Sequence, residues 1–198
     1  MKYPKLAKQI IDLKKADLAM RDRLIESSEL NDGYNEQMEA LHNVNADKLQ
    51  DIIDEIGFPS IDKVGKEASD AAWLVIQHAI SKPLFMKSCL THLQRLANNE
   101  DAYRIPIAYL SDRIAVFQDK PQLYGTQFDW DDQGMMSPQL MDDAGLVNQR
   151  RHELGLNTVE QQTIIMRRQA VKESEVPQDS GARKKEYDEW RKKVGWIR

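Results

Sequence analysis

The stretch Ala71-Ala-Trp-Leu-Val-Ile-Gln-His-Ala-Ile80 is apolar on nearly every side when it is wound as a helix. It forms the second half of a helical segment that starts near Val64. A helix of this kind belongs in the centre of a folded domain, because it has no face suited to water. The sequence therefore predicts a mainly α protein in which this helix is buried.

Amphipathic helices are expected on both sides of this segment, because apolar residues recur with helical spacing between charged ones. The first covers residues 6–30, with an extension past the Asn31-Asp-Gly break to Leu41 as the alternative. Asn45 is a suitable N-cap for a second helix. Four more follow at residues 82–96, 106–117, 142–154 and 158–170. Together they predict a multi-helix single domain that spans residues 1–170.

One inner segment, Gln122-Leu-Tyr-Gly-Thr-Gln127, has no helical period. Its aromatic and branched residues predict a small β-hairpin or extended segment over residues 122–141. If the chain is extended, the side chains of Gln122, Tyr124 and Thr126 share one face. The internal glycine is typical of a bulge or of close approach by a ligand. We expect this segment to form the wall of a functional pocket, with a purely structural role as the alternative.

Residues 171–198 form a charge-rich C-terminal appendix. Pro177 and the Ser180-Gly pair predict a linker, after which Trp190 and Trp196 are the large apolar side chains. The appendix is expected either to dock on its own domain through these tryptophans or to bind a protein partner through residues 183–198.

The charge balance excludes one class of partner. The 198 residues carry 28 basic and 32 acidic side chains, a formal net charge of -4, so a nucleic acid is not expected as a partner. The N-terminus lacks the apolar run of a signal peptide, and no stretch approaches the roughly eighteen apolar residues of a membrane span. With a single cysteine, the chain is expected to be cytoplasmic, with no membrane association.

Two polar residues interrupt the central helix, Gln77 and His78. Buried polar groups need hydrogen-bond partners, so a core role is one interpretation. The other places His78 in a cleft as a general acid or base, with Gln77 orienting a substrate. Cys89, three residues before His92, is expected to be a small buried hydrophobe, with a nucleophile as the weaker alternative.

Arginines supply the candidate anion-binding groups. Arg113 lies beside Asp112 at the edge of the apolar stripe of its helix, which suits a rim ion pair or an anionic ligand. Arg150 and Arg151 fall on the apolar path of the next helix, so at least one guanidinium should lean inward. A planar guanidinium in such a place could bind a carboxylate or phosphate.

Four motifs occur in order along the chain: Trp73-Leu-Val-Ile-Gln-His-Ala, Leu110-Ser-Asp-Arg-Ile, Pro121-Gln-Leu-Tyr-Gly-Thr-Gln and Arg150-Arg-His-Glu-Leu-Gly-Leu. This order resembles a bacterial domain family of uncharacterised function, whose members share QHA, DR, QxYGTQ and RRxExGL. The resemblance covers residues 61–170, and Ala79-Ile stands where relatives carry an aspartate. It implies no reaction. It implies that the motif residues belong to one site: Gln77, His78, Asp112, Arg113, Gln122, Tyr124, Gly125, Thr126, Gln127 and Arg151.

This combination of residue types predicts an enzyme, a hydrolase or group transferase acting on a small anionic or amide-bearing substrate. His78 is expected to be the acid/base, with Tyr124 and Asp112 as further catalytic groups. The expected substrate-binding residues are Gln77, Arg113, Gln122, Gly125, Thr126, Gln127, Arg150 and Arg151. The alternative function is a non-catalytic ligand- or peptide-binding accessory or immunity-type protein.

No metal and no cofactor are expected, because the histidines have no zinc-site spacing. A metal enzyme that uses His78 with Asp112 or His92 is the weaker alternative.

Overall fold

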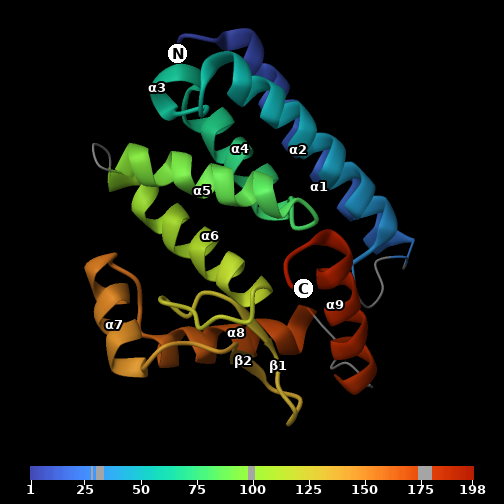
Figure 1. Ribbon diagram of the computed structural model, residues 1–198, viewed down its shortest axis with the longest axis vertical. Helices are drawn as coiled ribbons and strands as arrows, with labels where there is room; N and C mark the ends of the chain where they lie inside the picture. Colours follow the sequence, from blue (N-terminus) through green and yellow to red (C-terminus); the bar gives the residue numbers. More distant parts are fainter. Residues whose placement is uncertain (28, 30–33, 98–100, 174–179) are drawn as a thin grey trace. The chain divides into compact units, whose positions relative to one another are not determined.

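The computed structural model describes residues 1–27, 29, 34–97, 101–173 and 180–198. Within these residues the chain is mainly helical, with one small antiparallel sheet, which confirms the predicted fold class (Figure 1). Its contacts divide it into two compact units, Met1–His92 and Leu93–Arg198. The division falls inside a helix and not at residue 170, where the sequence analysis placed the end of the helical domain.

The first unit is built around α4, as expected for its apolar sequence. It contains α1 (Pro4–Glu26), α2 (Glu36–Ile56), α3 (Ile61–Val64), α4 (Lys66–His78) and the first part of α5 (Pro83–Ala97). Helices α1, α2 and α3 each pack against α4, and α1 and α2 run side by side (Figure 1). The buried side of α4 carries Ala71, Ala72, Val75 and Ile76.

The start of α2 differs from the sequence-based expectation. The side chain of Asn35 caps this helix by accepting hydrogen bonds from the main-chain nitrogens of Gln37 and Met38, at 2.9 and 3.2 Å. The expectation that Asn45 caps a separate helix was therefore wrong. Asn45 lies buried within α2 and donates to the carbonyl oxygen of Leu13 at 3.3 Å. The expected end of the first helix, near residue 30, lies outside the described residues.

The second unit combines helices with the hairpin. After the end of α5 come η1 (Asp101–Tyr103), α6 (Arg104–Phe117), β1 (Phe128–Trp130), β2 (Met136–Pro138), α7 (Ala144–Glu153), α8 (Val159–Glu173) and α9 (Ser180–Val194). Strands β1 and β2 pair antiparallel with Asp129 opposite Ser137, so the predicted hairpin is confirmed. Helix α8 packs against β2, and Arg167 donates to the carbonyl oxygen of Met136 at 3.0 Å.

Helix α9 docks on its own unit. Trp196 stacks on Phe117 of α6 with ring centroids 4.9 Å apart, and Trp190 meets the same ring edge-on at 5.7 Å. Arg191 is buried, and donates to the carbonyl oxygen of Phe117 at 3.2 Å and to Asp119 at 2.7 Å. The structure shows the first of the two expected arrangements of the appendix, in which it docks on its own chain through the tryptophans. Ser180 begins α9 and does not lie in a linker, while Pro177 lies outside the described residues.

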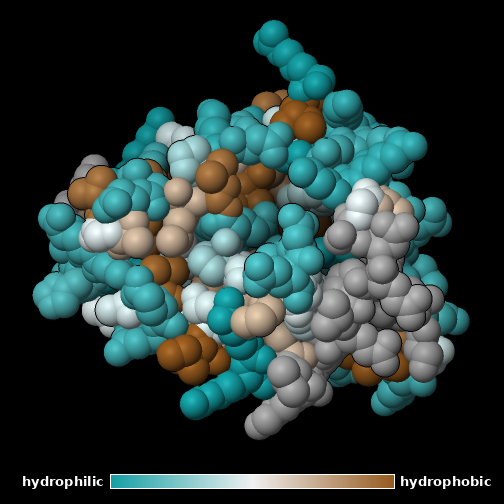
Figure 2. All heavy atoms as spheres, turned by 90° about the horizontal axis from the view of Figure 1, so that it is seen from below, coloured by the Kyte–Doolittle hydropathy of each residue, from teal (hydrophilic) through white to brown (hydrophobic). Residues whose placement is uncertain are grey.

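Hydrophilic residues dominate the face drawn in Figure 2, where apolar residues form separate groups and not one continuous patch. Among the described residues, no helix has the length and apolar character needed to cross a membrane.

Candidate functional site

Three ionisable side chains from three helices meet in the interior of the first unit. Asp17 comes from α1, His42 from α2 and His78 from the last turn of α4. One carboxylate oxygen, Oδ2 of Asp17, lies 2.9 Å from Nδ1 of His78 and 3.0 Å from Nε2 of His42. The two imidazole rings have centroids 4.9 Å apart. We call these three residues the Asp-His-His cluster.

Helical periodicity explains why two of these residues point inward. Asp17 occupies the buried stripe of α1, four residues after Leu13 and seven after Ile10. His42 lies in the same way on the buried stripe of α2, four residues after Met38. A polar residue on an otherwise apolar stripe is the signal in the sequence that marks both. The sequence-based prediction named only His78 of the three.

The hydroxyl of Tyr34, two residues before the start of α2, contacts two members of the cluster. It lies 2.6 Å from Nδ1 of His42 and donates to the carbonyl oxygen of His78 at 3.3 Å. Burial raises the pKa of Tyr34 above its ordinary value, so the hydroxyl stays protonated. These contacts orient the ring of His42 with its Nε2 toward Asp17.

Two histidines are the basic residues that contact the buried carboxylate of Asp17. Its side chain is 1% exposed, and those of His42 and His78 are 8% and 31% exposed. Burial opposes the ionisation of Asp17, but the two neighbouring imidazoles outweigh it and hold the pKa of this carboxyl below its ordinary value. Among the described residues, no lysine or arginine pairs with Asp17. The cluster is therefore a buried carboxylate between two imidazoles.

Two buried atoms of the cluster lack a hydrogen bond to any described residue: Oδ1 of Asp17 and Nε2 of His42. The 3.0 Å separation between Nε2 and Oδ2 is short enough for an ion pair, but the orientation of the groups does not make it a hydrogen bond. A buried polar atom without a partner costs about 1–3 kcal/mol. Both atoms are thus available to a further group.

His78 is the member of the cluster that reaches solvent. Asp17 binds its Nδ1, and no described residue hydrogen-bonds its Nε2. A carboxylate on one imidazole nitrogen fixes the ring orientation and leaves the other nitrogen to exchange a proton. Gln77, the predicted orienting residue, is half-buried beside it on α4. The arrangement can perform proton transfer.

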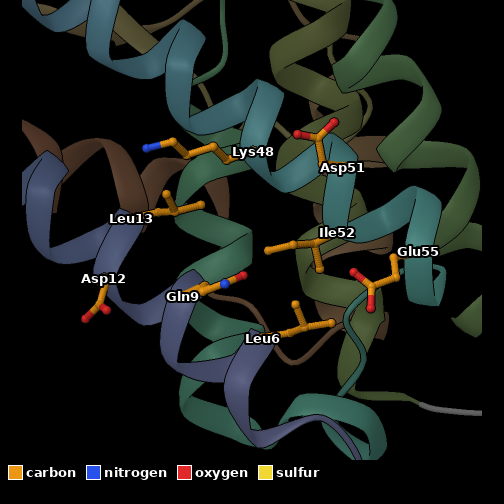
Figure 3. Close-up of a pocket in the computed structure, with 8 residues that line it drawn as sticks. All are labelled: Leu6, Gln9, Asp12, Leu13, Lys48, Asp51, Ile52 and Glu55. Atoms are coloured by element: carbon orange, nitrogen blue, oxygen red, sulfur yellow. The ribbon is translucent and has the colours of Figure 1, made fainter.

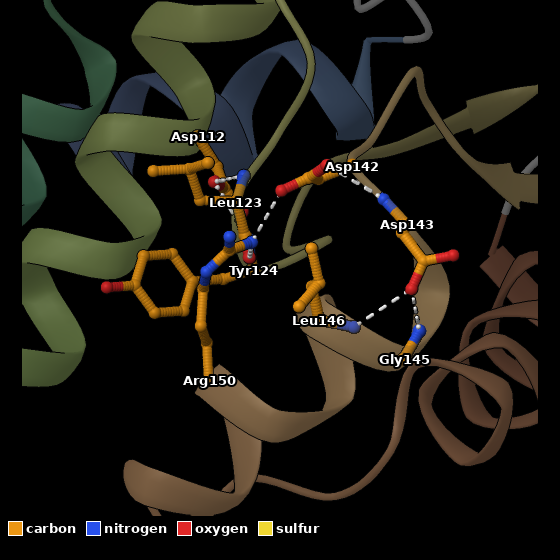
Figure 4. A network of polar contacts seen from close by, with 8 residues as sticks. All are labelled: Asp112, Leu123, Tyr124, Asp142, Asp143, Gly145, Leu146 and Arg150. Carbon is orange, nitrogen blue, oxygen red and sulfur yellow. Dashed lines mark hydrogen bonds and ion pairs between the residues drawn. The ribbon is translucent and has the colours of Figure 1, made fainter.

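Asp112 organises the loop formed by residues 122–127 in the second unit (Figure 4). Its Oδ1 accepts from the main-chain nitrogen of Leu123 at 2.8 Å. Its Oδ2 accepts from the main-chain nitrogen and the hydroxyl of Thr126, both at 3.0 Å. Burial raises the pKa of Asp112, while these hydrogen bonds oppose the shift. The chain turns around this carboxylate, so the expected extended strand with alternating faces was wrong for residues 123–127.

Gln122 closes the same loop from within. Its Nε2 donates to the carbonyl oxygens of Gln127 and Gln139 at 3.0 and 3.1 Å, and its Oε1 accepts from the main-chain nitrogen of Gln127 at 2.7 Å. Arg113 donates through Nε to Oε1 of Gln127 at 3.0 Å. Burial lowers the pKa of Arg113 below its ordinary value. The hydrogen bonds of Gln122 and Gln127 therefore stabilise the conformation of the loop.

Both arginines of α7 also bind the loop. Arg151 is buried and donates to the carbonyl oxygen of Tyr124 at 2.8 Å and to Oδ1 of Asn157 at 2.8 Å, which confirms that one guanidinium leans inward. Arg150 is half-buried and donates to the carbonyl oxygen of Leu123 at 3.2 Å and to Asp142 at 2.9 Å (Figure 4). Each guanidinium therefore gives at least one hydrogen bond to the main chain of the loop and others to residues outside it.

The predicted site residues thus fall into two sets. Gln77 and His78 belong to the first unit. The second unit brings the others together around residues 122–127, where their hydrogen bonds go largely to the main chain. These are Asp112, Arg113, Gln122, Tyr124, Gly125, Thr126, Gln127, Arg150 and Arg151. Catalytic and substrate-binding roles for this second set stay predictions.

Comparison with known proteins gives a family but no activity. The sequence profile of a family of unknown function, DUF6624, matches residues 4–171. The chain belongs to this family. The match confirms the predicted resemblance to a family without a known reaction. No curated protein and no solved structure matches the chain.

The region that matches DUF6624 includes the whole Asp-His-His cluster and the loop held by Asp112, but not α9.

Cys89 also lies inside this region. It is buried, and burial raises the pKa of its thiol to about 12, so it is not a thiolate nucleophile at neutral pH. His92, the base considered for it, contacts the ring of Phe58. The expectation that Cys89 is a buried hydrophobe is confirmed.

A shallow groove between α1 and α2 of this DUF6624 chain has a volume of about 430 Å³ (Figure 3). Apolar side chains form part of its wall, and Lys48, Asp51 and Glu55 line it from α2. Asp12 on its rim forms an ion pair with Lys8 at 2.6 Å. None of the residues that line the groove has a buried side-chain atom without a hydrogen-bond partner, in contrast to the Asp-His-His cluster.

Proposed function

We propose that this DUF6624 chain is an enzyme, a hydrolase or a group transferase, in which His78 transfers protons. Asp17 is the positioning residue that holds Nδ1 of His78. The single observation that carries the proposal is the 2.9 Å contact between Nδ1 and a carboxylate that is 1% exposed, on a histidine that is itself 31% exposed.

The contacts of two arginines support a narrower substrate class within this proposal. Arg113 and Arg151, expected to hold a carboxylate or phosphate, donate to the loop at residues 122–127. The proposal therefore rests on proton transfer and does not depend on these arginines. Cleavage or transfer at an amide or ester suits such a centre, because the attacking hydroxyl loses a proton and the leaving group gains one. We favour an amide-bearing substrate over an anionic one.

The test compares variants on a panel of chromogenic amides, esters and phosphoesters in the presence of EDTA. His78→Ala should lower turnover at least about 100-fold, the ordinary contribution of a general acid or base. Its far-ultraviolet circular dichroism should remain near wild type. The matched control is His152→Ala, which removes an exposed histidine of α7. It should retain full turnover.

Two outcomes would contradict the proposal. If His78→Ala turns over every substrate as fast as wild type, His78 is not catalytic. If the wild-type chain turns over no substrate while binding one of them in a His78-dependent manner, the chain is the non-catalytic binding module of the alternative hypothesis. Asp17→Asn separates positioning from packing, because it keeps the shape but removes the charge that holds the imidazole.

A further inference from the structure

The Asp-His-His cluster has the geometry of a metal-binding site. Asp17, His42 and His78 each offer one ligand atom, and these three atoms all lie within 4.8 Å of one another. Two ligand atoms that each lie about 2.1 Å from one ion are about 3.0 Å apart at a right angle and about 3.4 Å apart at the tetrahedral angle that Zn²⁺ prefers. The two distances from Oδ2 to the imidazole nitrogens, 2.9 and 3.0 Å, lie close to this range, so a small shift of the side chains would admit an ion.

The unpaired atoms of the cluster point to the same conclusion. Oδ1 of Asp17 and Nε2 of His42 belong to side chains that are more than nine-tenths buried, and neither has a hydrogen-bond partner among the described residues. A cation beside Oδ2 would take the lone pair of Nε2 and could draw in Oδ1 as a second carboxylate ligand. It would also neutralise a buried charge that no described lysine or arginine meets.

Tyr34 adds an independent observation. A histidine that binds a metal through one nitrogen usually has a hydrogen-bond partner on the other, which fixes its tautomer and direction. The hydroxyl of Tyr34 occupies that place on His42, 2.6 Å from Nδ1. The same hydroxyl can donate to the carbonyl oxygen of His78 at 3.3 Å, which leaves it free to accept from Nδ1. In that arrangement Nε2 carries a lone pair close to the carboxylate, and a cation between the two would remove their repulsion.

We propose that Asp17, His42 and His78 form a binding site for a divalent first-row transition metal, with Zn²⁺ as the first candidate. This goes against the expectation of a metal-independent pocket, which rested on sequence spacing. Two imidazoles and one carboxylate suit Zn²⁺. The ligands come from three helices, so no local spacing in the sequence reveals them.

Metal binding has a consequence for the proposed enzyme. A cation on Nδ1 of His78 replaces the hydrogen bond from this nitrogen to Asp17 and withdraws electron density from the ring. When the metal is bound, His78 can no longer transfer protons, so the metal inhibits the proposed active site. Binding itself does not depend on the proposed function, whereas the inhibition rests on it.

The experiment measures Zn²⁺ binding to the full chain by calorimetry after removal of metals with EDTA. Wild type should bind one equivalent, and Co²⁺ should give the absorption of a site with nitrogen and oxygen ligands. His42→Gln and Asp17→Asn should each bind at least about 100-fold more weakly, because each lacks a ligand. Tyr34→Phe keeps all three ligands and should bind about 10-fold more weakly. His152→Gln, the control, should bind as wild type does.

Wild-type chain that binds no equivalent of Zn²⁺ or Co²⁺ would overturn the metal site, as would equal binding by Asp17→Asn and His152→Gln. Tyr34→Phe keeps the experiment interpretable if the other variants fail to fold, because it leaves all three ligands in place and removes only the hydroxyl that contacts His42. Turnover tests the inhibitory role separately. Zn²⁺ should lower His78-dependent turnover, and EDTA should restore it. If Zn²⁺ binds as expected but raises turnover, the metal site stands and the acid/base role of His78 is wrong.

Discussion

The carboxylate of Asp112 accepts hydrogen bonds on both oxygens, from the main chain of Leu123 and from Thr126. Asp112→Asn is therefore expected to lower the free energy of unfolding by about 2–4 kcal/mol, because an amide NH₂ would face N–H donors in a buried place. Urea denaturation measures the change. Asp143→Asn is the control, because this exposed N-cap accepts through a single oxygen and asparagine caps equally well. Equal losses in the two variants would contradict this account.

Gly125 combines a left-handed backbone with close packing. Its φ is +60°, and a Cβ there would lie 3.1 Å from Cγ2 of Val159. Gly155 has φ +69° with no atom within 4 Å of such a Cβ. Gly155→Ala should cost about 1 kcal/mol of unfolding free energy from backbone strain, and Gly125→Ala about 2–4 kcal/mol from strain plus overpacking. Thermal unfolding of both variants checks the order, and a Gly155→Ala loss as large as that of Gly125→Ala would refute it.

Among the elements, helices with strong periodicity could be predicted from the sequence, and so could the hairpin. The start of α2 could not, because Asn35 and Asn45 are both good caps and the periodic pattern fits either. The curled loop at residues 122–127 was missed because its shape is imposed by Asp112, a residue of another element. Asp17 and His42 were missed for a related reason, since their meeting depends on how α1 and α2 pack on α4.

The N-cap of α2 can be tested by itself. Asn35→Ala removes the acceptor for the main-chain nitrogens of Gln37 and Met38 and should cost about 1 kcal/mol of unfolding free energy. Asn35→Asp keeps an acceptor and adds charge that favours a helix N-terminus, so its loss should be smaller. Chemical denaturation compares the two. A helix that starts near Asn45 would leave both variants at wild-type stability.

On the scale of the whole molecule, the chain consists of two compact units, and its predicted site residues are shared between them. The family match covers both units as far as residue 171. Each unit has its own buried polar centre: Asp17 with two histidines in the first, and Asp112 with the loop it holds in the second. We infer different tasks for the two. The first centre has unpaired buried atoms and a solvent-facing histidine, whereas the second uses its polar atoms to hold main chain.

Deletion of residues 180–198 tests this division of tasks. Loss of α9 uncovers Phe117, which stacks on Trp196, and should lower the unfolding free energy of the second unit by about 3–5 kcal/mol, the usual cost of truncating a buried aromatic. Turnover that depends on His78 should stay within about twofold of wild type, because α9 packs within the second unit and all three residues of the Asp-His-His cluster belong to the first. Trp196→Ala serves as a milder variant. A truncated chain that keeps its circular dichroism but loses turnover would show that the proposed site is not confined to the first unit. A truncated chain that keeps turnover but no longer binds a partner protein would support a partner-binding role for residues 183–198.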